Sequence, residues 1–220
     1  MSPQNRTGKI VTVDGPGGTG KSTVSRVIAY KAGLPHLDTG AYYRAATLAV
    51  VEAGVDPTDE RAVVDVVSGS RFDQESGHMF LDGRDVSEEI RSEEVTSAVS
   101  AVSAHPGVRR ELVEKQRSWI DEHDGRGVIE GRDIGSVVFP DADLKIYLDA
   151  SPEVRARRRA RETGEDFDSV LADLNRRDRL DSTRVVSPLK VPEGAVVVDT
   201  SELSFEQVVE HLLHMITAKS

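Results

Sequence analysis

A glycine-rich octapeptide near the start of the chain constrains the fold more than any other feature. It reads Gly15-Pro16-Gly17-Gly18-Thr19-Gly20-Lys21-Ser22 and matches the pattern G-x-x-x-x-G-K-[ST]. The apolar run Ile10–Val13 precedes it, and the segment Ser22–Tyr30 after it carries apolar residues at helical spacing. We therefore predict a strand, a phosphate-binding loop and a helix in direct succession.

Each residue type in this loop has a chemical reason. Glycines let backbone N–H groups turn toward a phosphate, Lys21 supplies a positive charge, and the Ser22 hydroxyl can bind Mg²⁺. The positive end of the new helix points at the same anion. The pattern predicts that ATP and Mg²⁺ bind at Gly15, Pro16, Gly17, Gly18, Thr19, Gly20, Lys21, Ser22 and Thr23.

Short apolar runs alternate with helical patterns along the rest of the chain, which is typical of a parallel sheet with crossover helices. We predict an α/β fold, a P-loop NTPase core whose central parallel sheet has about five strands flanked by helices. Four runs are expected to be buried core strands, and a shorter fifth run is a weaker candidate. The runs are Ile10–Val13, Val128–Glu130, Leu144–Leu148 and Val196–Val198, with Pro35–Asp38 as the fifth.

Other local patterns predict helix ends and an insertion. Ser151-Pro152-Glu153 has the residues of a helix N-terminus, and Ser204–Thr217 has the spacing of a terminal amphipathic helix. Arg71–Val86 alternates apolar and polar residues around a Gly83 turn, so we predict a small antiparallel hairpin there. Helices are expected on either side of it, near Asp59–Val67 and Val108–Asp121.

Composition excludes several classes of protein. The 220 residues include no cysteine, which excludes disulfides and thiolate zinc sites. The net charge of −10 and the 5% aromatic content argue against a nucleic-acid-coating protein. No run approaches 18 apolar residues, and the polar start lacks a signal peptide, so we expect a cytoplasmic monomer with no nucleic-acid or membrane partner.

A P-loop alone does not separate kinases from GTPases or motors. The sequence lacks the guanine-reading N-K-x-D pattern, and its placed arginines favour a small-molecule kinase. Four segments together resemble the bacterial cytidylate kinase family and spread over nearly the whole chain. They are Val13–Gly17, the D-T-G-A-Y-Y-R segment Asp38–Arg44, the E-G-R-D-I-G segment Glu130–Gly135, and Arg177–Arg184.

The resemblance implies transfer of the γ-phosphoryl group of ATP to CMP or dCMP, with Mg²⁺. It implies that Thr39, Arg44 and Arg132 hold the acceptor phosphate, that Ser100, Arg109, Asp133 and Arg184 read cytosine, and that Arg177 and Asp181 reach the ribose. Lys21, Arg132, Arg158 and Arg159 would be the catalytic side chains. It also implies one domain over 1–220: a core (8–55, 101–150, 185–220), an inserted monophosphate-binding subdomain (approximately 56–100) and a short helical lid (approximately 153–170).

These roles agree with simple chemistry. Guanidinium groups make two-point contacts with phosphate oxygens, and a carboxylate accepts the N4 hydrogen bond that distinguishes cytosine from uracil. Arg177, Asp181 and Arg184 share one face if their segment is helical. No general base is needed, because the acceptor phosphate is already anionic near neutral pH.

Each role has a plainer alternative. Arg44 could form a surface ion pair, Asp133 could cap a helix or join the Mg²⁺ shell, and Ser100 could be helix surface. Arg177 and Asp181 could form an intrahelical pair. The basic run Arg155–Arg161 could be a solvated face or, less favourably, a nucleic-acid patch. For the whole protein, the alternatives are a uridylate, thymidylate or shikimate kinase, or a nucleotide-dependent switch.

Overall fold

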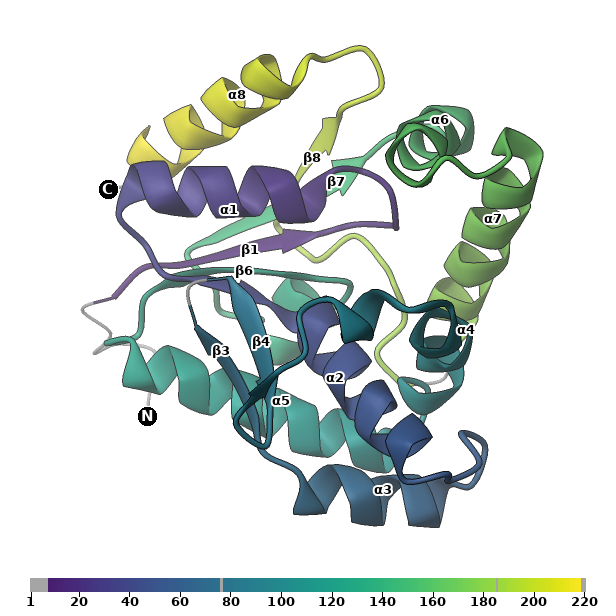
Figure 1. Ribbon diagram of the computed structural model, residues 1–220. Coiled ribbons are helices and arrows are strands. Elements are labelled where there is room, and N and C mark those ends of the chain that lie inside the picture. The colour runs from purple at the N-terminus through teal and green to yellow at the C-terminus, as the bar shows by residue number, and fades with distance from the viewer. Residues whose placement is uncertain (1–7, 76, 185, 219–220) are drawn as a thin grey trace. The chain divides into compact units, whose positions relative to one another are not determined.

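The computed structural model describes residues 8–75, 77–184 and 186–218, which group into two compact units. The first unit comprises the chain up to Leu37 and from Ile120 onward, and the second runs from Asp38 to Trp119. A five-stranded sheet has the order β2-β6-β1-β7-β8, and a separate three-stranded sheet has the order β3-β4-β5 (Figure 1). The prediction of an α/β fold with a five-stranded parallel sheet is confirmed.

The elements have the following bounds. The strands are β1 Ile10–Asp14, β2 His36–Asp38, β3 Phe72–Glu75, β4 His78–Leu81, β5 Arg84–Asp85, β6 Gly127–Gly131, β7 Leu144–Asp149 and β8 Val196–Asp199. The helices are α1 Lys21–Ala32, α2 Thr39–Glu52, α3 Glu60–Gly69, α4 Glu93–Val102, α5 Pro106–Glu122, α6 Pro152–Thr163, α7 Phe167–Thr183 and α8 Phe205–Ala218. There are also two short turns among the described residues, the 3₁₀ turn η2 Glu89–Arg91 and the π-helical turn η3 Ile134–Val138.

The core of the first unit lies between the sheet and a helical layer. Strand β1 is buried along its whole length, and its β-branched residues suit a central strand. Helices α1 and α8 lie side by side over one face of the sheet (Figure 1). Val11 and Val13 of β1 pack in one cluster with Ile28 of α1 and Leu212 of α8. This layer fixes the end of β1, where the phosphate-binding loop begins.

Strand β8 differs from its prediction. Val196 and Val197 are 39% and 53% exposed, and only Val198 joins the core cluster. The prediction of a fully buried strand is wrong here because β8 is the last strand of the sheet and pairs only with β7 among the described strands. Its apolar residues alone did not distinguish an edge strand from a central one.

The predicted hairpin in the second unit is a three-stranded antiparallel sheet. Phe72, Met79 and Leu81 point to its buried face, as their alternation predicted. Strands β4 and β5 are joined by Asp82 and Gly83, whose φ angles are 52° and 82°. Two consecutive residues with positive φ are typical of the tight turn that matches the strand twist.

Two helices begin at residues whose side chains cap the first turn. The Ser151 hydroxyl accepts the backbone N–H of Val154, with Pro152 in the first turn of α6, as predicted. Asp38 caps α2 by accepting the N–H of Ala41. In the part of the chain that the structure describes, no helix is both long and apolar enough to cross a membrane.

Candidate functional site

The phosphate-binding loop leaves the end of β1 and enters α1, as the sequence predicted. Gly15 has a φ of 145°, which side-chain-bearing residues rarely adopt. A Cβ atom at Gly15 would overlap the carbonyl oxygen of Leu148 in β7. The loop therefore packs directly on the neighbouring strand, and only glycine fits at its first position.

Lys21 lies across this loop. Its Nζ donates to the carbonyl oxygen of Pro16 at 2.6 Å and lies 3.4 Å from the Thr19 hydroxyl. The side chain is only 6% exposed, and it stands in the first turn of α1. An ammonium group and the positive end of a helix are therefore directed at the same loop.

Ser22 contacts an acidic residue that the sequence analysis did not single out. Its hydroxyl donates to Oε2 of Glu130 at 2.9 Å, and Nε2 of His36 lies 3.2 Å from Oε1 of the same carboxylate. Glu130 is 2% exposed and occupies the end of β6. Its position, an acid at the carboxyl end of a predicted strand next to the P-loop strand, was the available signal.

The oxygens of Ser22 and Glu130 suit Mg²⁺, which prefers hydroxyl, carboxylate and phosphate oxygens. Among the described residues, no group of three or more His, Cys, Asp or Glu side chains could hold a metal ion by itself.

Asp14 fixes the E-G-R-D-I-G segment to the end of β1. Its two carboxylate oxygens accept the backbone N–H groups of Ile134 and Gly135 at 2.7 and 2.8 Å. Burial raises the pKa of the Asp14 carboxyl to about 6, against the opposing effect of the two N–H bonds. The residues before Ile134 are thus held beside the P-loop strand.

Arg132, Asp181 and Arg184 form one cluster. Nε of Arg132 donates to Oδ2 of Asp181 at 3.0 Å, and Nη1 of Arg184 lies 3.4 Å from Oδ1. A Cβ atom on Gly17 would lie 3.5 Å from Nη2 of Arg132. The cluster therefore adjoins the phosphate-binding loop.

The predicted helical face over Arg177, Asp181 and Arg184 is partly wrong. Helix α7 ends at Thr183, and Arg184 has an extended backbone with a ψ of 144°. Nε of Arg184 donates to the Ser187 carbonyl at 2.6 Å in the segment that follows. Arg184 thus reaches Asp181 from beyond the helix end.

Arg177 pairs toward the start of its helix. Its Nε lies 2.8 Å from Oδ2 of Asp173, one turn earlier, so the intrahelical pair that the structure shows for Arg177 is with Asp173. Burial lowers the pKa of the Arg177 guanidinium, against the opposing effect of Asp173.

Asp133 is 3% exposed, and its backbone carbonyl accepts the Val137 N–H at 2.9 Å to start η3.

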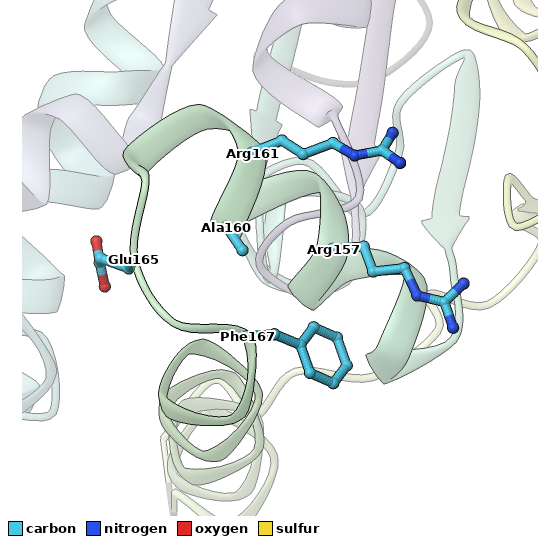
Figure 2. A pocket seen from close by; sticks show the side chains of 5 residues that line it. All are labelled: Arg157, Ala160, Arg161, Glu165 and Phe167. Atoms are coloured by element: carbon cyan, nitrogen blue, oxygen red, sulfur yellow. The ribbon is translucent and has the colours of Figure 1, made fainter.

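The arginines of α6 divide into separate groups. Arg158 donates to the carbonyl of Thr200 at 2.6 Å and approaches the Thr19 carbonyl at 3.5 Å. Arg159 lies 3.6 Å from Glu162 on an exposed surface. Arg157 and Arg161 extend to the same side of α6, where they line an open hollow of about 430 Å³ with Ala160, Glu165 and Phe167 (Figure 2).

In the second unit, Arg44 joins three elements. Nη1 of Arg44 in α2 donates to the Ile90 carbonyl of η2 and to the Thr96 hydroxyl of α4, both at 3.0 Å. The side chain is half-buried, and these two acceptors are uncharged. The two hydrogen bonds tie the side chain to the fold of this unit.

The other three candidates of this unit lie on α2, α4 and α5. Thr39 and Arg109 are each 3% exposed. The guanidinium of Arg109 lies 5.2 Å from the centre of the Tyr43 ring, and its Nη1 donates to the Ser103 carbonyl at 3.3 Å. Ser100 is partly exposed on α4, where its carbonyl accepts the Ser103 hydroxyl.

Solved structures share this fold. An uncharacterised protein from Eubacterium ventriosum matches with a TM-score of 0.56 at 10% identity, covering 96% of this chain and 98% of that one. Shikimate kinase from Acinetobacter baumannii, solved with shikimate, matches with a TM-score of 0.50 at 14% identity, covering 98% and 96%. At these identities the likeness concerns the fold alone.

Sequence comparison is more specific. The profile of the cytidylate kinase family matches residues 11–218. Proteins named cytidylate kinase are 52% identical in Mycobacterium leprae and 53% in Rhodococcus opacus, with 96% of this chain and 96% of each relative covered. The relative in Corynebacterium glutamicum is 49% identical, with 97% and 96% covered. The chain belongs to the cytidylate kinase family.

Proposed function

We propose that the protein transfers the γ-phosphoryl group of ATP to CMP or dCMP, giving ADP and CDP or dCDP. Family membership supports this activity, and one observation in the first unit carries it. The Arg132 guanidinium adjoins Gly17 of the phosphate-binding loop and also bonds Asp181 of α7. One cation thus stands next to the donor loop and to a helix with the predicted ribose-binding residues, as phosphoryl transfer requires.

On the donor side, the residues from Gly15 to Thr23 bind the triphosphate, and Lys21 neutralises its outer oxygens. Ser22 would hold Mg²⁺, with Glu130 orienting its hydroxyl, and the ion would neutralise and align the phosphates. Arg158 and Arg159 belong to a lid, approximately 153–170, that excludes water from the γ-phosphoryl group. Water exclusion matters because an open site would hydrolyse ATP.

On the acceptor side, Thr39, Arg44 and Arg132 hold the monophosphate, whose oxygen attacks the γ-phosphorus. The attack needs no general base, because the second phosphate pKa is about 6 and the oxygen is already anionic. Arg177 and Asp181 take the ribose hydroxyls. The segment of approximately 56–100 acts as an inserted subdomain for monophosphate binding.

Base selection follows from Asp133, with Ser100, Arg109 and Arg184. A buried carboxylate accepts the exocyclic N4 hydrogen of cytosine, whereas uracil presents an oxygen there and leaves the carboxylate badly paired. Arginines donate to the base O2 and N3. This set distinguishes a cytidylate kinase from a kinase for uridylate, thymidylate or shikimate.

We also propose that the protein is a cytoplasmic monomer. Its partners would be nucleotides, and it would bind neither nucleic acid nor membranes. Its net charge of −10 favours repulsion from polyanions. Light scattering after size exclusion tests the monomer, and a dimer mass would contradict it.

A coupled assay for ADP release tests the activity, with Mg·ATP and a panel of CMP, dCMP, UMP, AMP, dTMP and shikimate. Rapid turnover with CMP and dCMP alone is expected. Turnover with another acceptor would support a kinase activity but contradict the base-reading roles. Slow ATP hydrolysis at a rate that does not depend on the acceptor would instead indicate a nucleotide-dependent switch.

A further inference from the structure

Arg155 is buried, yet the reaction as described does not use it. The residue lies in the first turn of α6 and is 3% exposed. Its Nε donates to the carbonyl of Ala150, and its Nη1 donates to the carbonyl of Gly17, both at 3.0 Å. The same Nη1 lies 2.6 Å from Oδ2 of Asp178 in α7. One guanidinium therefore joins the phosphate-binding loop to two helices.

The contact with Gly17 concerns the backbone that binds phosphate. In a trans peptide the carbonyl of one residue and the N–H of the next point in opposite directions. When Arg155 holds the Gly17 carbonyl on the side of α6, the N–H of Gly18 is turned to the other side. Backbone N–H groups of this loop are the groups that cradle phosphate oxygens.

Packing at the next residue supports the same orientation. Gly18 has a φ of 78°, and a Cβ atom there would lie 3.1 Å from the Cβ of Arg155. Helix α6 and the loop are thus in direct contact at both ends of the Gly17–Gly18 peptide.

Asp178 supplies the charge that keeps Arg155 in place. A buried guanidinium without its carboxylate is strongly unfavourable, so the pair acts as a unit. Asp178 follows Arg177 and precedes Asp181 by three residues on α7. The helix with the predicted ribose-binding residues thereby connects to the phosphate-binding loop through Arg155.

We propose that Arg155, held by Asp178, is a positioning residue that orients the Gly17–Gly18 peptide for binding the donor phosphates. The inference rests on the proposed nucleotide-binding role of the loop, but not on the identity of the acceptor. It assigns the first arginine of the α6 run to loop geometry, separately from the lid role of Arg158 and Arg159.

The test measures ADP binding by titration calorimetry without acceptor, well below the unfolding temperature, in Arg155→Met and Asp178→Asn. We expect ADP to bind at least about tenfold more weakly in Arg155→Met, the equivalent of one lost hydrogen bond. KM for ATP should rise similarly, with KM for CMP changed less than about threefold. The double variant should bind ADP no more weakly than Arg155→Met, because Asp178 acts through Arg155.

Arg176→Met is the matched control, since Arg176 lies 2.6 Å from Asp173 in an exposed pair on the same helix. It should leave ADP binding unchanged. Asp178→Asn keeps the side-chain volume and serves as the test if Arg155→Met does not fold.

Unchanged ADP affinity in the variants, or an equal rise of both KM values, would overturn the inference and leave a merely structural pair. Failure of the proposed acceptor would appear only in the acceptor panel, with the ADP result intact. An unsubstituted protein that does not bind ADP would contradict both proposals.

Discussion

Nε of Arg132 donates to Oδ2 of Asp181 at 3.0 Å, although the two residues are 49 positions apart in the sequence. Arg184 approaches the other oxygen of the same carboxylate. Two guanidinium groups therefore share one negative charge, and the cluster carries a net charge of +1 at neutral pH. Such a cluster can hold an anionic acceptor while its own geometry stays fixed.

Replacing Asp181 should separate ribose recognition from arginine positioning. In Asp181→Asn we expect kcat/KM for CMP to fall about a hundredfold, because an amide holds two arginines poorly and donates where the 2′-OH must donate. The loss for dCMP should be smaller, since dCMP lacks the 2′-OH. Steady-state kinetics with both acceptors measure this, with Ser182→Ala as control because its hydroxyl bonds only carbonyls of its own helix among the described contacts. Equal losses for CMP and dCMP would limit Asp181 to positioning Arg132 and Arg184.

Replacing Asp133 should reduce the discrimination between bases. Asp133→Ala is expected to lower kcat/KM for CMP by roughly 10² or more, with little change for UMP, because only cytosine loses its N4 partner. The ratio of the two constants is the measurement. Asp141→Ala, at an exposed position, serves as control. A parallel loss for CMP and UMP would contradict the cytosine-reading role and leave a structural carboxylate.

Glu130 should affect the requirement for Mg²⁺. In Glu130→Gln the Ser22 hydroxyl loses a charged partner, so the Mg²⁺ concentration for half-maximal rate should rise about tenfold. The Mg²⁺ dependence of ADP binding, measured by calorimetry, should shift in the same direction, while ADP binding without metal stays unchanged. Glu122→Gln repeats the substitution at an exposed site of α5. An unaltered Mg²⁺ titration would show that Glu130 serves only the fold.

Asp14 should make stability depend on pH in an unusual direction. Burial raises its pKa from 3.8 to about 6, so between these values the native protein binds the proton more tightly than the unfolded chain. Its contribution is complete below pH 3.8 and is lost as the pH rises through about 6, by roughly 3 kcal/mol at about 1.4 kcal/mol per pH unit. Urea unfolding from about pH 4 to pH 7 measures the free energy of unfolding of the parent and of Asp14→Asn. The value for the parent minus the value for the variant should fall as the pH rises.

Asp56→Asn provides the opposite control for that measurement. The Thr58 N–H and hydroxyl lower the pKa of the Asp56 carboxyl, so its contribution is present above 3.8 and is lost only as the pH falls below that value. The free energy of unfolding of the parent minus that of Asp56→Asn should therefore stay constant over the measured range and fall only in a further measurement below pH 3.8. A parent-to-variant difference that does not change with pH for Asp14→Asn would mean that this carboxyl stays ionised in the native protein.

The strands and the phosphate-binding loop were predictable because their signals are local. Ile10–Asp14 is a β-branched run next to a glycine pattern, and the helix after it begins where the pattern ends. The hairpin near Gly83 likewise follows from alternation and a turn residue. The third strand, Arg84–Asp85, has only two residues, which is too short for any periodicity.

Helix α2 was missed for a different reason. Residues on all its faces are buried, including Ala45, Ala46, Thr47 and Leu48, so apolar and polar positions do not alternate at helical spacing. Helix packing on several sides removes the pattern that reveals most helices.

Contacts between residues far apart in the sequence could not be predicted from local patterns. Glu130 meets Ser22 108 positions away, and Arg155 meets Gly17 138 positions away. Within its own segment Arg155 is one of five similar arginines, and no local pattern separates the buried one from the four that are more exposed. Only the tertiary fold assigns them different partners.

Strand β8 has a consequence for handling the protein at high concentration. Among the described strands it lies at one edge of the sheet, with Val196 and Val197 exposed, and such an edge can pair with the same strand of another molecule. Its four residues and the exposed Asp199 at its end keep that pairing short and charged. A lysine in place of Val197 would block it at little cost to the core, and is the first substitution to try if concentrated samples precipitate.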